Sequence, residues 1–350
     1  MIFARPGGEM AHTLLHVRKA AAVTILASLA LPPSPASAAN DKTYVMKLST
    51  ATVNDVQHEW MKRFVATVEK DSGDRIKGEI YPSSQLGSIP RQIEGTQFGS
   101  IQGWVGPPEF LVGIDQRYEA MTAPALFTSL AQHIRVTNDP AVNAMMLGLG
   151  ANKGLLGIGL FSAGMNSIVS RKPVHHLAEF KGMKIRVLAS PFQLEMIKRM
   201  DASPVAMSLG DVLPALQQGA IDGSLGNVAV FAPFHYQDAA KYITEINQPY
   251  VTCIAEMNRK WVEALPADLQ SVLRQDAAAT SRGIVPFLHE FIDAQHKEWT
   301  GKGGKLIDLP SDEQTALNAR LAGIGDDLSK ANPELNKAVK LIIDSAAHNK

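Results

Sequence analysis

The sequence is poor in cysteine, with Cys253 as the only one among 350 residues. A single cysteine excludes an intramolecular disulfide, so the hydrophobic core has to stabilise the fold, and a chain of this length can supply that core. We expect Cys253 to be a buried residue that behaves as a small apolar side chain. No cysteine lies near the N-terminus to carry a lipid anchor.

The sequence also lacks an excess of charge of either sign, with 34 basic and 34 acidic residues and a net charge of zero. Binding of nucleic acid or of an anionic membrane surface relies on a basic patch, so we expect neither partner. The composition, 45% hydrophobic and 19% charged, is typical of a globular protein of one or two domains.

Long hydrophobic runs are missing as well. The apolar run at 20–31 is too short to span a bilayer. It follows Arg18 and Lys19 and precedes the small-residue sequence ASA at 36–38, the pattern of a cleavable signal peptide that covers residues 1–38. We therefore expect export to a bacterial periplasm and no direct membrane insertion of the mature chain. The signal-peptide pattern does not distinguish Met1 from Met10 as the start of translation.

Catalytic and metal-binding motifs are absent. The sequence has no G-x-S-x-G, no P-loop and no G-x-G-x-x-G after a predicted strand. His175 and His176 are adjacent and would point to opposite faces of a strand, and His235 with Asp238 would supply only half of a metal site. We expect Asp222 to bond backbone amides in a turn rather than act as a base. These observations predict no enzyme, no cofactor and no metal.

Alternating strand and helix patterns occupy much of the chain. Residues 44–105 and 180–223 each follow a βαβαβ order, which is typical of parallel sheets with right-handed crossovers. The predicted strands cover residues 44–49, 76–81, 101–105, 155–161, 167–170, 183–187, 204–207, 220–222, 242–245, 250–257 and 306–309. The predicted helices cover residues 57–70, 90–98, 139–149, 209–218, 258–264, 266–300, 311–329 and 333–347, and Pro286 should kink the longest of them.

The two βαβ sets predict two lobes of similar plan, with the chain crossing between them more than once. We assign residues 43–163 plus 252–291 to the first lobe and residues 164–251 plus 292–347 to the second. Arg186 ends a predicted strand of the second lobe, and small ligands bind outside the carboxyl ends of strands in such sheets. Its guanidinium could grip a carboxylate with two hydrogen bonds, although on the residues alone a surface salt bridge is as good an explanation.

Four segments of the sequence resemble one family of binding proteins. They are IYPSSQLG at 80–87, LAEFKGMKIRV at 177–187, ASPVAM at 202–207 and ALQQGAIDG at 215–223. The last three are similar to the patterns D-L-K-G-L-K-I-R-V, G-A-S-P-x-P-M and A-L-Q-x-G-x-V-D-G of the DctP-type substrate-binding proteins of TRAP (tripartite ATP-independent periplasmic) transporters. The resemblance covers about residues 44–347.

This resemblance implies an α/β fold of the periplasmic binding protein type, with two lobes joined by crossing strands and a long helix. It implies a cleft that closes on a small organic carboxylate, which is then delivered to the TRAP membrane permease subunits without catalysis. A periplasmic ligand sensor for a signalling receptor is an alternative with the same fold. An exported α/β enzyme is a third class, for which the chain has no triad-like or metal-like spacing.

The resemblance also implies site residues. Arg186 would pair with the ligand carboxylate, and Asn166 stands where the family often has a second arginine or a glutamine. Asn227 follows Gly226, which occupies a position where the family often has asparagine. Leu209 stands where an aromatic residue can form a wall of the pocket.

Four further residues are candidates for ligand contact. Trp104 and Phe161 end predicted strands, His58 lies in the first helix, and Gln85 lies in the matched loop. The sialic-acid binders of the family carry an acidic residue near the position of Pro107, so the proline here favours a monocarboxylate with an apolar or aromatic body.

Overall fold

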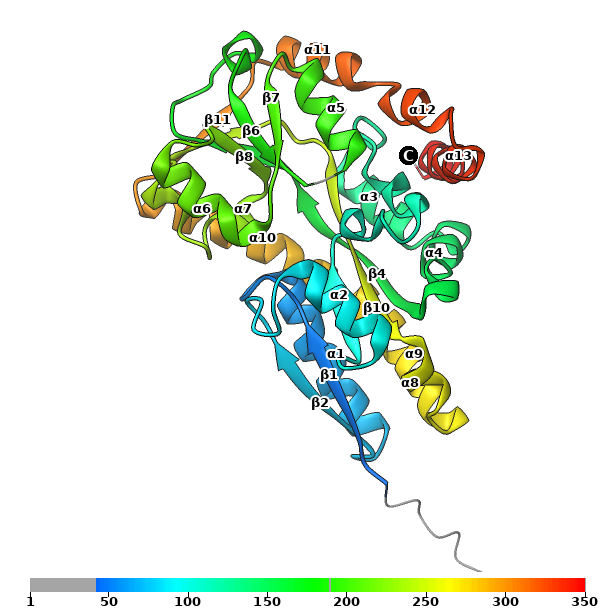
Figure 1. Ribbon diagram of the computed structural model, residues 1–350. Helices are drawn as coiled ribbons and strands as arrows, with labels where there is room; N and C mark the ends of the chain where they lie inside the picture. Colours follow the sequence, from blue (N-terminus) through cyan, green and yellow to red (C-terminus); the bar gives the residue numbers. More distant parts are fainter. Residues whose placement is uncertain (1–41, 189, 350) are drawn as a thin grey trace, which may run out of the picture. The chain divides into compact units, whose positions relative to one another are not determined.

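The computed structural model describes residues 42–188 and 190–349, and the predicted signal peptide, residues 1–38, lies outside them. Two mixed sheets with helices packed against them form the fold (Figure 1). The first sheet has the order β2-β1-β3-β10-β4. Its strands are β1 (Tyr44–Ser49), β2 (Ile76–Tyr81), β3 (Gly103–Gly106), β4 (Leu155–Met165) and β10 (Tyr250–Asn258).

The second sheet has the order β11-β9-β5-β8-β6-β7. Its strands are β5 (Ser167–Ser170), β6 (Lys184–Val187), β7 (Ser203–Ala206), β8 (Gly223–Gly226), β9 (Tyr242–Glu245) and β11 (Lys305–Asp308). Within each predicted βαβαβ set the strands pair in parallel, β1 with β2 and β3, and β6 with β7 and β8, as the sequence predicts.

The chain passes between the two sheets at three places. β4 of the first sheet reaches β5 of the second through Asn166 alone. β9 of the second sheet returns to β10 of the first through residues 246–249. Helix α9 (Ala267–Gly283) contacts β4 of the first sheet, and α10 (Val285–Gly301), which follows it after Ile284, also contacts β11 of the second.

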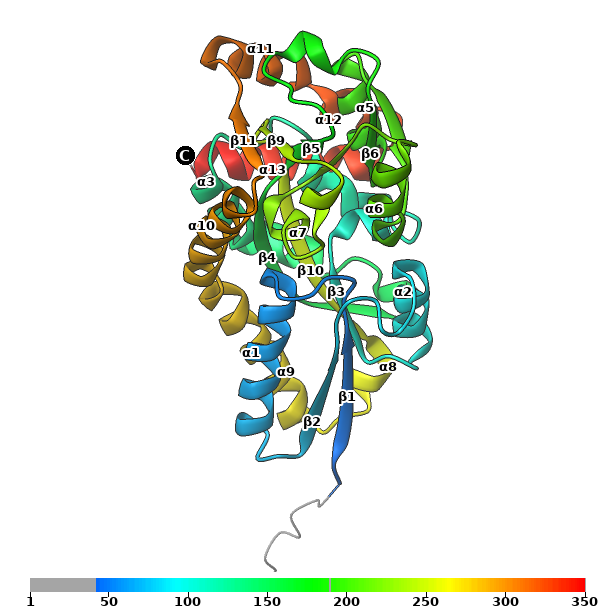
Figure 2. The same cartoon turned by 90° about the vertical axis from the view of Figure 1, so that its left-hand side faces the viewer.

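The remaining helices cover the sheets and the sides of the molecule (Figures 1 and 2). They are α1 (Val56–Asp71), α2 (Ile89–Phe98), α3 (Leu130–Thr137), α4 (Pro140–Leu147), α5 (Pro191–Arg199), α6 (Leu209–Gln218), α7 (Val228–Phe231), α8 (Arg259–Glu263), α11 (Ser311–Leu321), α12 (Ile324–Ser329) and α13 (Pro333–His348). Short 3₁₀ turns connect several of them, among them η1 (Pro108–Leu111) and η2 (Gln116–Thr122).

Several predicted boundaries were wrong for local reasons. The helix predicted at 266–300 is divided at Ile284, two residues before Pro286, and the helix predicted at 311–329 is divided at Gly323, whose φ of 82° favours glycine. The strand predicted at 220–222 begins at Gly223 instead. Asp222 accepts a hydrogen bond from the amide of Lys184 at 2.8 Å, which is the backbone-bonding role that the sequence predicts for it.

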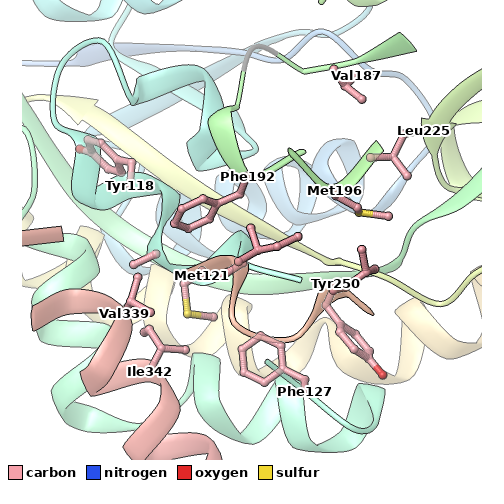
Figure 3. Close-up of a cluster of buried hydrophobic side chains, with 14 of the residues drawn as sticks. Tyr118, Met121, Phe127, Val187, Phe192, Met196, Leu225, Tyr250, Val339 and Ile342 are labelled. Carbon is pink, nitrogen blue, oxygen red and sulfur yellow. The ribbon is translucent and has the colours of Figure 1, made fainter. Parts of the chain in front are cut away.

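Three apolar clusters among the described residues hold the sheets and helices together. One lies between the first sheet and helices α1 and α9, and Cys253 is fully buried in it, as expected. The second joins the second sheet to η2, α5 and α13, and Figure 3 shows Phe192, Met121 and Val339 grouped there. The third packs helices α6, α7 and α10 against the second sheet. Apolar packing therefore covers at least one side of each sheet. The cavity described below is lined by polar and apolar side chains together.

A buried histidine ties the two crossing strands β4 and β10 together. The ring nitrogens of His133 lie 2.9 Å from the hydroxyl of Ser162 on β4 and 2.9 Å from that of Thr252 on β10. His133 is completely buried, and this burial lowers the pKa of its imidazole from 6.5 to about 3. In the native protein the imidazole is therefore neutral while it makes these two hydrogen bonds.

We expect His133 to make stability fall as the pH is lowered. Below pH 6.5 the unfolded chain binds a proton on this residue that the native protein does not, so stability present above pH 6.5 is lost as the pH falls toward 3. The expected loss is about 2 kcal/mol between pH 7 and pH 5. Urea unfolding of the wild type and of His133→Gln at both pH values measures it, with the exposed His175→Gln as control. A stability difference between wild type and His133→Gln that is equal at pH 7 and pH 5 would contradict this expectation.

Candidate functional site

A cavity lies between the two sheets and contains about 860 Å³ of empty space, including the part that opens to solvent. Side chains from both sheets line it. Five of the eight ligand contacts predicted from the sequence are in this lining. They are Trp104, Asn166, Arg186, Leu209 and Asn227.

Arg186 enters the cavity from the carboxyl half of β6. In the sheet it pairs with Val205 of β7 and with Ser224 of β8. Its Nε donates a hydrogen bond to the carbonyl of Met207 at 3.0 Å, which fixes the direction of the guanidinium. The side chain is only 3% exposed, and its Nη2 has no hydrogen-bond partner among the described residues. The sheet therefore presents a buried cation with an unused donor to the cavity.

Tyr236 is the polar neighbour of Arg186 in this wall. Burial raises the pKa of its phenol to about 12, and the positive charge of Arg186 opposes that rise. Burial lowers the pKa of Arg186 to about 10, so at neutral pH the guanidinium stays charged and the phenol stays protonated. The hydroxyl of Tyr236 has no partner among the described residues, which makes it a second donor available to an anion.

The two asparagines lie where the chain leaves the sheets. Asn166 is the residue between β4 and β5 and is 6% exposed. Asn227 precedes α7, and its Nδ2 donates to the carbonyl of Ala163 at 3.0 Å, while its Oδ1 has no partner among the described residues. Gly226 lines the cavity too, but a Cβ added there would lie 2.7 Å from the ring of Phe231. The space left by the missing asparagine is thus filled by an aromatic ring.

The opposite wall comes from the end of β3 and from the start of α1. The ring of Trp104 packs on Gly106, where an added Cβ would lie 2.3 Å from the indole. The indole Nε1 is buried without a partner among the described residues, so it is a further donor at the cavity. Asp55 and Gln57 also line this wall, and the carboxylate of Asp55 accepts hydrogen bonds from the amide of His58 and from the side chain of Gln57.

Three predicted ligand contacts lie outside the cavity lining. Phe161 is buried in the core under α1, where its ring stacks on that of Trp60 at a centroid distance of 5.5 Å. The imidazole of His58 accepts from the backbone amide of Asn54 at 3.1 Å, and Gln85 is an exposed loop residue. For these three residues ligand contact stays a prediction to which the cavity adds no support.

The sequence analysis missed a buried carboxyl, Glu109, in the turn that follows β3. It lines the cavity, and its Oε1 accepts from Nε2 of Gln193 at 3.3 Å. No motif indicates this residue, because its position depends on how η1 packs against η2, α2 and β10. No motif indicates Gln193, Tyr236 and Ser224 either, and with them the cavity is more polar than the sequence suggests.

Two kinds of feature do not occur in the described part of the chain. Across residues 42–188 and 190–349, no helix is both long and apolar enough to cross a membrane. Within the same residues, no three histidine, cysteine, aspartate or glutamate side chains gather into a group that could hold a metal ion.

Comparison with known proteins gives a family and a fold. The model of the family of bacterial extracellular solute-binding proteins, family 7 (DctP), matches residues 48–330. Among curated proteins, YiiZ of Salmonella typhimurium is 28% identical over 207 residues, which are 59% of this chain and 63% of that protein. The chain thus matches less than two thirds of the length of this relative.

Two solved structures share the arrangement of the two sheets. A TRAP periplasmic solute-binding protein from Desulfovibrio salexigens with bound orotic acid has a TM-score of 0.83 at 21% identity, covering 88% of this chain and 100% of that one. The sugar acid binding protein DctPAm from Advenella mimigardefordensis, in complex with galactonate, has a TM-score of 0.83 at 19% identity, covering 88% and 99%. The two-lobed α/β fold predicted from the sequence is confirmed, and so is the resemblance that predicted it.

Proposed function

Because this chain belongs to the DctP family of bacterial extracellular solute-binding proteins, we propose that it captures a small organic acid between its lobes and delivers it to a TRAP permease. The observation that carries the proposal is the guanidinium of Arg186, which is buried at the cavity with an unused donor. A desolvated cation without a counter-charge is costly, so a ligand carboxylate that supplies the charge would be bound strongly.

The other side chains of the cavity suit the rest of such a ligand. Tyr236 and Arg186 together could hold the two carboxylate oxygens, since both have unused donors. Asn166 and Asn227 offer amide groups beside them, and Trp104 and Leu209 provide apolar surface against the body of the acid. The acids named in the two solved relatives, orotic acid and galactonate, both carry a carboxylate, which agrees with this assignment.

Contact between a ligand and the guanidinium of Arg186 requires the lobes to move. With Arg186 only 3% exposed, a ligand cannot reach the guanidinium from solvent while the walls stay in place. We propose that the lobes are residues 43–163 plus 252–291 and residues 164–251 plus 292–347, and that they open and close about the segments around Asn166, residues 246–249 and Ile284. A ligand that touches both walls would favour the closed state by its higher affinity for it.

The setting of this activity follows from the family. We propose that the chain works in the periplasm after removal of residues 1–38, as a binding protein without catalytic activity. We propose delivery to a membrane permease, the role that membership of the DctP family implies, rather than to a signalling receptor. Uptake of a bound acid by membrane vesicles that contain the permease, measured with and without this protein, tests the delivery step.

A ligand panel tests the capture step. We expect small carboxylates such as orotate or galactonate to raise the melting temperature, because a ligand at 100 times its Kd stabilises the native state by about 2.7 kcal/mol. That free energy corresponds to roughly 4 °C for a protein of this size. The uncharged amides of the same acids are the matched control and should have no effect. Equal stabilisation by acid and amide would contradict the role of the carboxylate.

A further inference from the structure

Glu109 is a buried carboxyl that the capture of a carboxylate does not require. It lies in η1, directly after the strand that carries Trp104, and only 3% of it is exposed. Its Oε1 accepts from Gln193 at 3.3 Å, and its Oε2 has no partner among the described residues. Both Glu109 and Gln193 line the cavity that contains Arg186. A polar atom that is buried at a cavity without a partner is costly unless something in the cavity bonds it.

We propose that Glu109 is a second recognition point, which selects monocarboxylates whose body carries hydroxyl, NH or carbonyl groups. The inference rests on the proposed function, since it takes Arg186 as the site of the ligand carboxylate. Gln193 holds one oxygen of Glu109 and leaves the other to bond a polar group of the ligand. The buried indole NH of Trp104 offers one more donor on the same wall. An apolar body would leave all of these groups unpaired.

The charges around Glu109 favour its neutral form. Burial, together with the nearby carboxyl of Glu119 on η2, raises the pKa of this carboxyl to about 8. From β10, the buried thiol of Cys253 and the buried carboxyl of Glu256 also have raised pKa values. The charged residues of α2, Arg91 and Glu94, are exposed. At neutral pH Glu109 is therefore mostly protonated and can both donate and accept.

The charge balance of the cavity also argues against a dicarboxylate. Among the described residues of the cavity lining, Arg186 is the only arginine or lysine. Asp55 and Glu109 supply the carboxyl groups of the same lining. Burial raises the pKa of Asp55, although the backbone and side-chain hydrogen bonds that it accepts oppose this rise. One guanidinium can neutralise one ligand carboxylate, and a second anionic group would face acidic side chains without a counter-charge.

Two pairs of acids of similar size that differ in the polarity of the body test the inference. Galactonate and hexanoate are six-carbon acids with and without hydroxyl groups, and orotate and benzoate are six-membered rings with and without NH and carbonyl groups. We expect the wild type to bind the polar member of a pair at least tenfold more tightly by isothermal titration calorimetry. In Glu109→Leu this ratio should fall at least tenfold, while Glu109→Gln, which keeps a donor and an acceptor, should stay close to the wild type.

A matched control is Glu256→Gln, because Glu256 is also a buried carboxyl but does not line the cavity. It accepts from the hydroxyl of Tyr118 at 2.7 Å, so the substitution should lower stability and leave the ratio unchanged. The pH gives a second readout. Affinity of the wild type for a polar acid should fall about tenfold from pH 7 to pH 9 as Glu109 ionises, and Glu109→Gln should lack this fall.

The outcomes separate this inference from the proposed function. Binding of acids that depends on Arg186, with a polar-to-apolar ratio that Glu109→Leu does not change, overturns the inference alone. Wild-type binding of hexanoate or benzoate as tight as that of the polar partner overturns it as well. Failure of every acid to bind overturns the proposed function and the inference with it.

Discussion

Arg186→Ala is expected to weaken binding of a carboxylate ligand by at least about 100-fold, since truncating one partner of a buried, hydrogen-bonded charge pair costs several kcal/mol. The guanidinium is 3% exposed and donates a hydrogen bond to the carbonyl of Met207. The described lining contains no other arginine or lysine that could replace its positive charge. Calorimetric titration with a ligand found in the panel measures the loss.

The fold should survive this substitution. Arg186 is desolvated and its Nη2 has no partner among the described residues, so its removal relieves an unpaired buried charge, which offsets the loss of its hydrogen bond to the carbonyl of Met207. We therefore expect the ligand-free Arg186→Ala protein to melt at or above the wild-type temperature. Arg186→Lys keeps the charge but not the two-pronged donor and should bind with intermediate affinity. An Arg186→Ala variant that binds within threefold of the wild type would refute the proposed role.

Phe161→Ala is expected to destabilise the protein by about 3–5 kcal/mol, the usual cost of removing a large aromatic side chain from a core. The ring of Phe161 is 1% exposed and stacks on Trp60, which in turn packs on Phe64 at a centroid distance of 4.8 Å. The indole of Trp60 also donates to the hydroxyl of Ser281 on α9, so the cavity left by the ring would weaken the contact between two helices and the sheet.

Leu209→Ala provides the matched control for this substitution, since Leu209 is half-buried and lines the cavity. Urea unfolding should give the large loss of stability for Phe161→Ala only, and titration of the folded proteins should give weaker binding for Leu209→Ala only. The prediction that Phe161 contacts the ligand would regain support if Phe161→Ala kept its stability and lost affinity.

Local patterns were sufficient for most of the strands and helices. Strands β1, β5 and β9 have the predicted bounds, because each is a short apolar segment between turn residues. The predicted helix at 139–149 corresponds to α4, but α3, which lies directly before it in the chain, was missed. Long-range pairing decided where β4 ends: it continues to Met165 because β10 pairs with it as far as Tyr250.

The sequence by itself determined the fold and the position of the cation at the end of β6. Parallel βαβ order and the family segments are local properties of the chain, and the resemblance of LAEFKGMKIRV to the family pattern was enough to identify Arg186. Asn166, Asn227, Trp104 and Leu209 were likewise named from the sequence and line the cavity.

Only the tertiary structure decided which buried groups meet Arg186 across the cavity. Glu109 and Gln193 are 84 residues apart in the chain. Trp104 lies on a strand of the first sheet and Tyr236 in a connection between strands of the second, although both line the cavity. No sequence spacing could have predicted that these residues meet. The sequence analysis named Phe161 as a candidate for ligand contact because it ends a predicted strand, but a residue at a strand end can face either a cavity or a core. Packing against Trp60 places it in the core, because side-chain burial depends on the neighbours that distant segments supply.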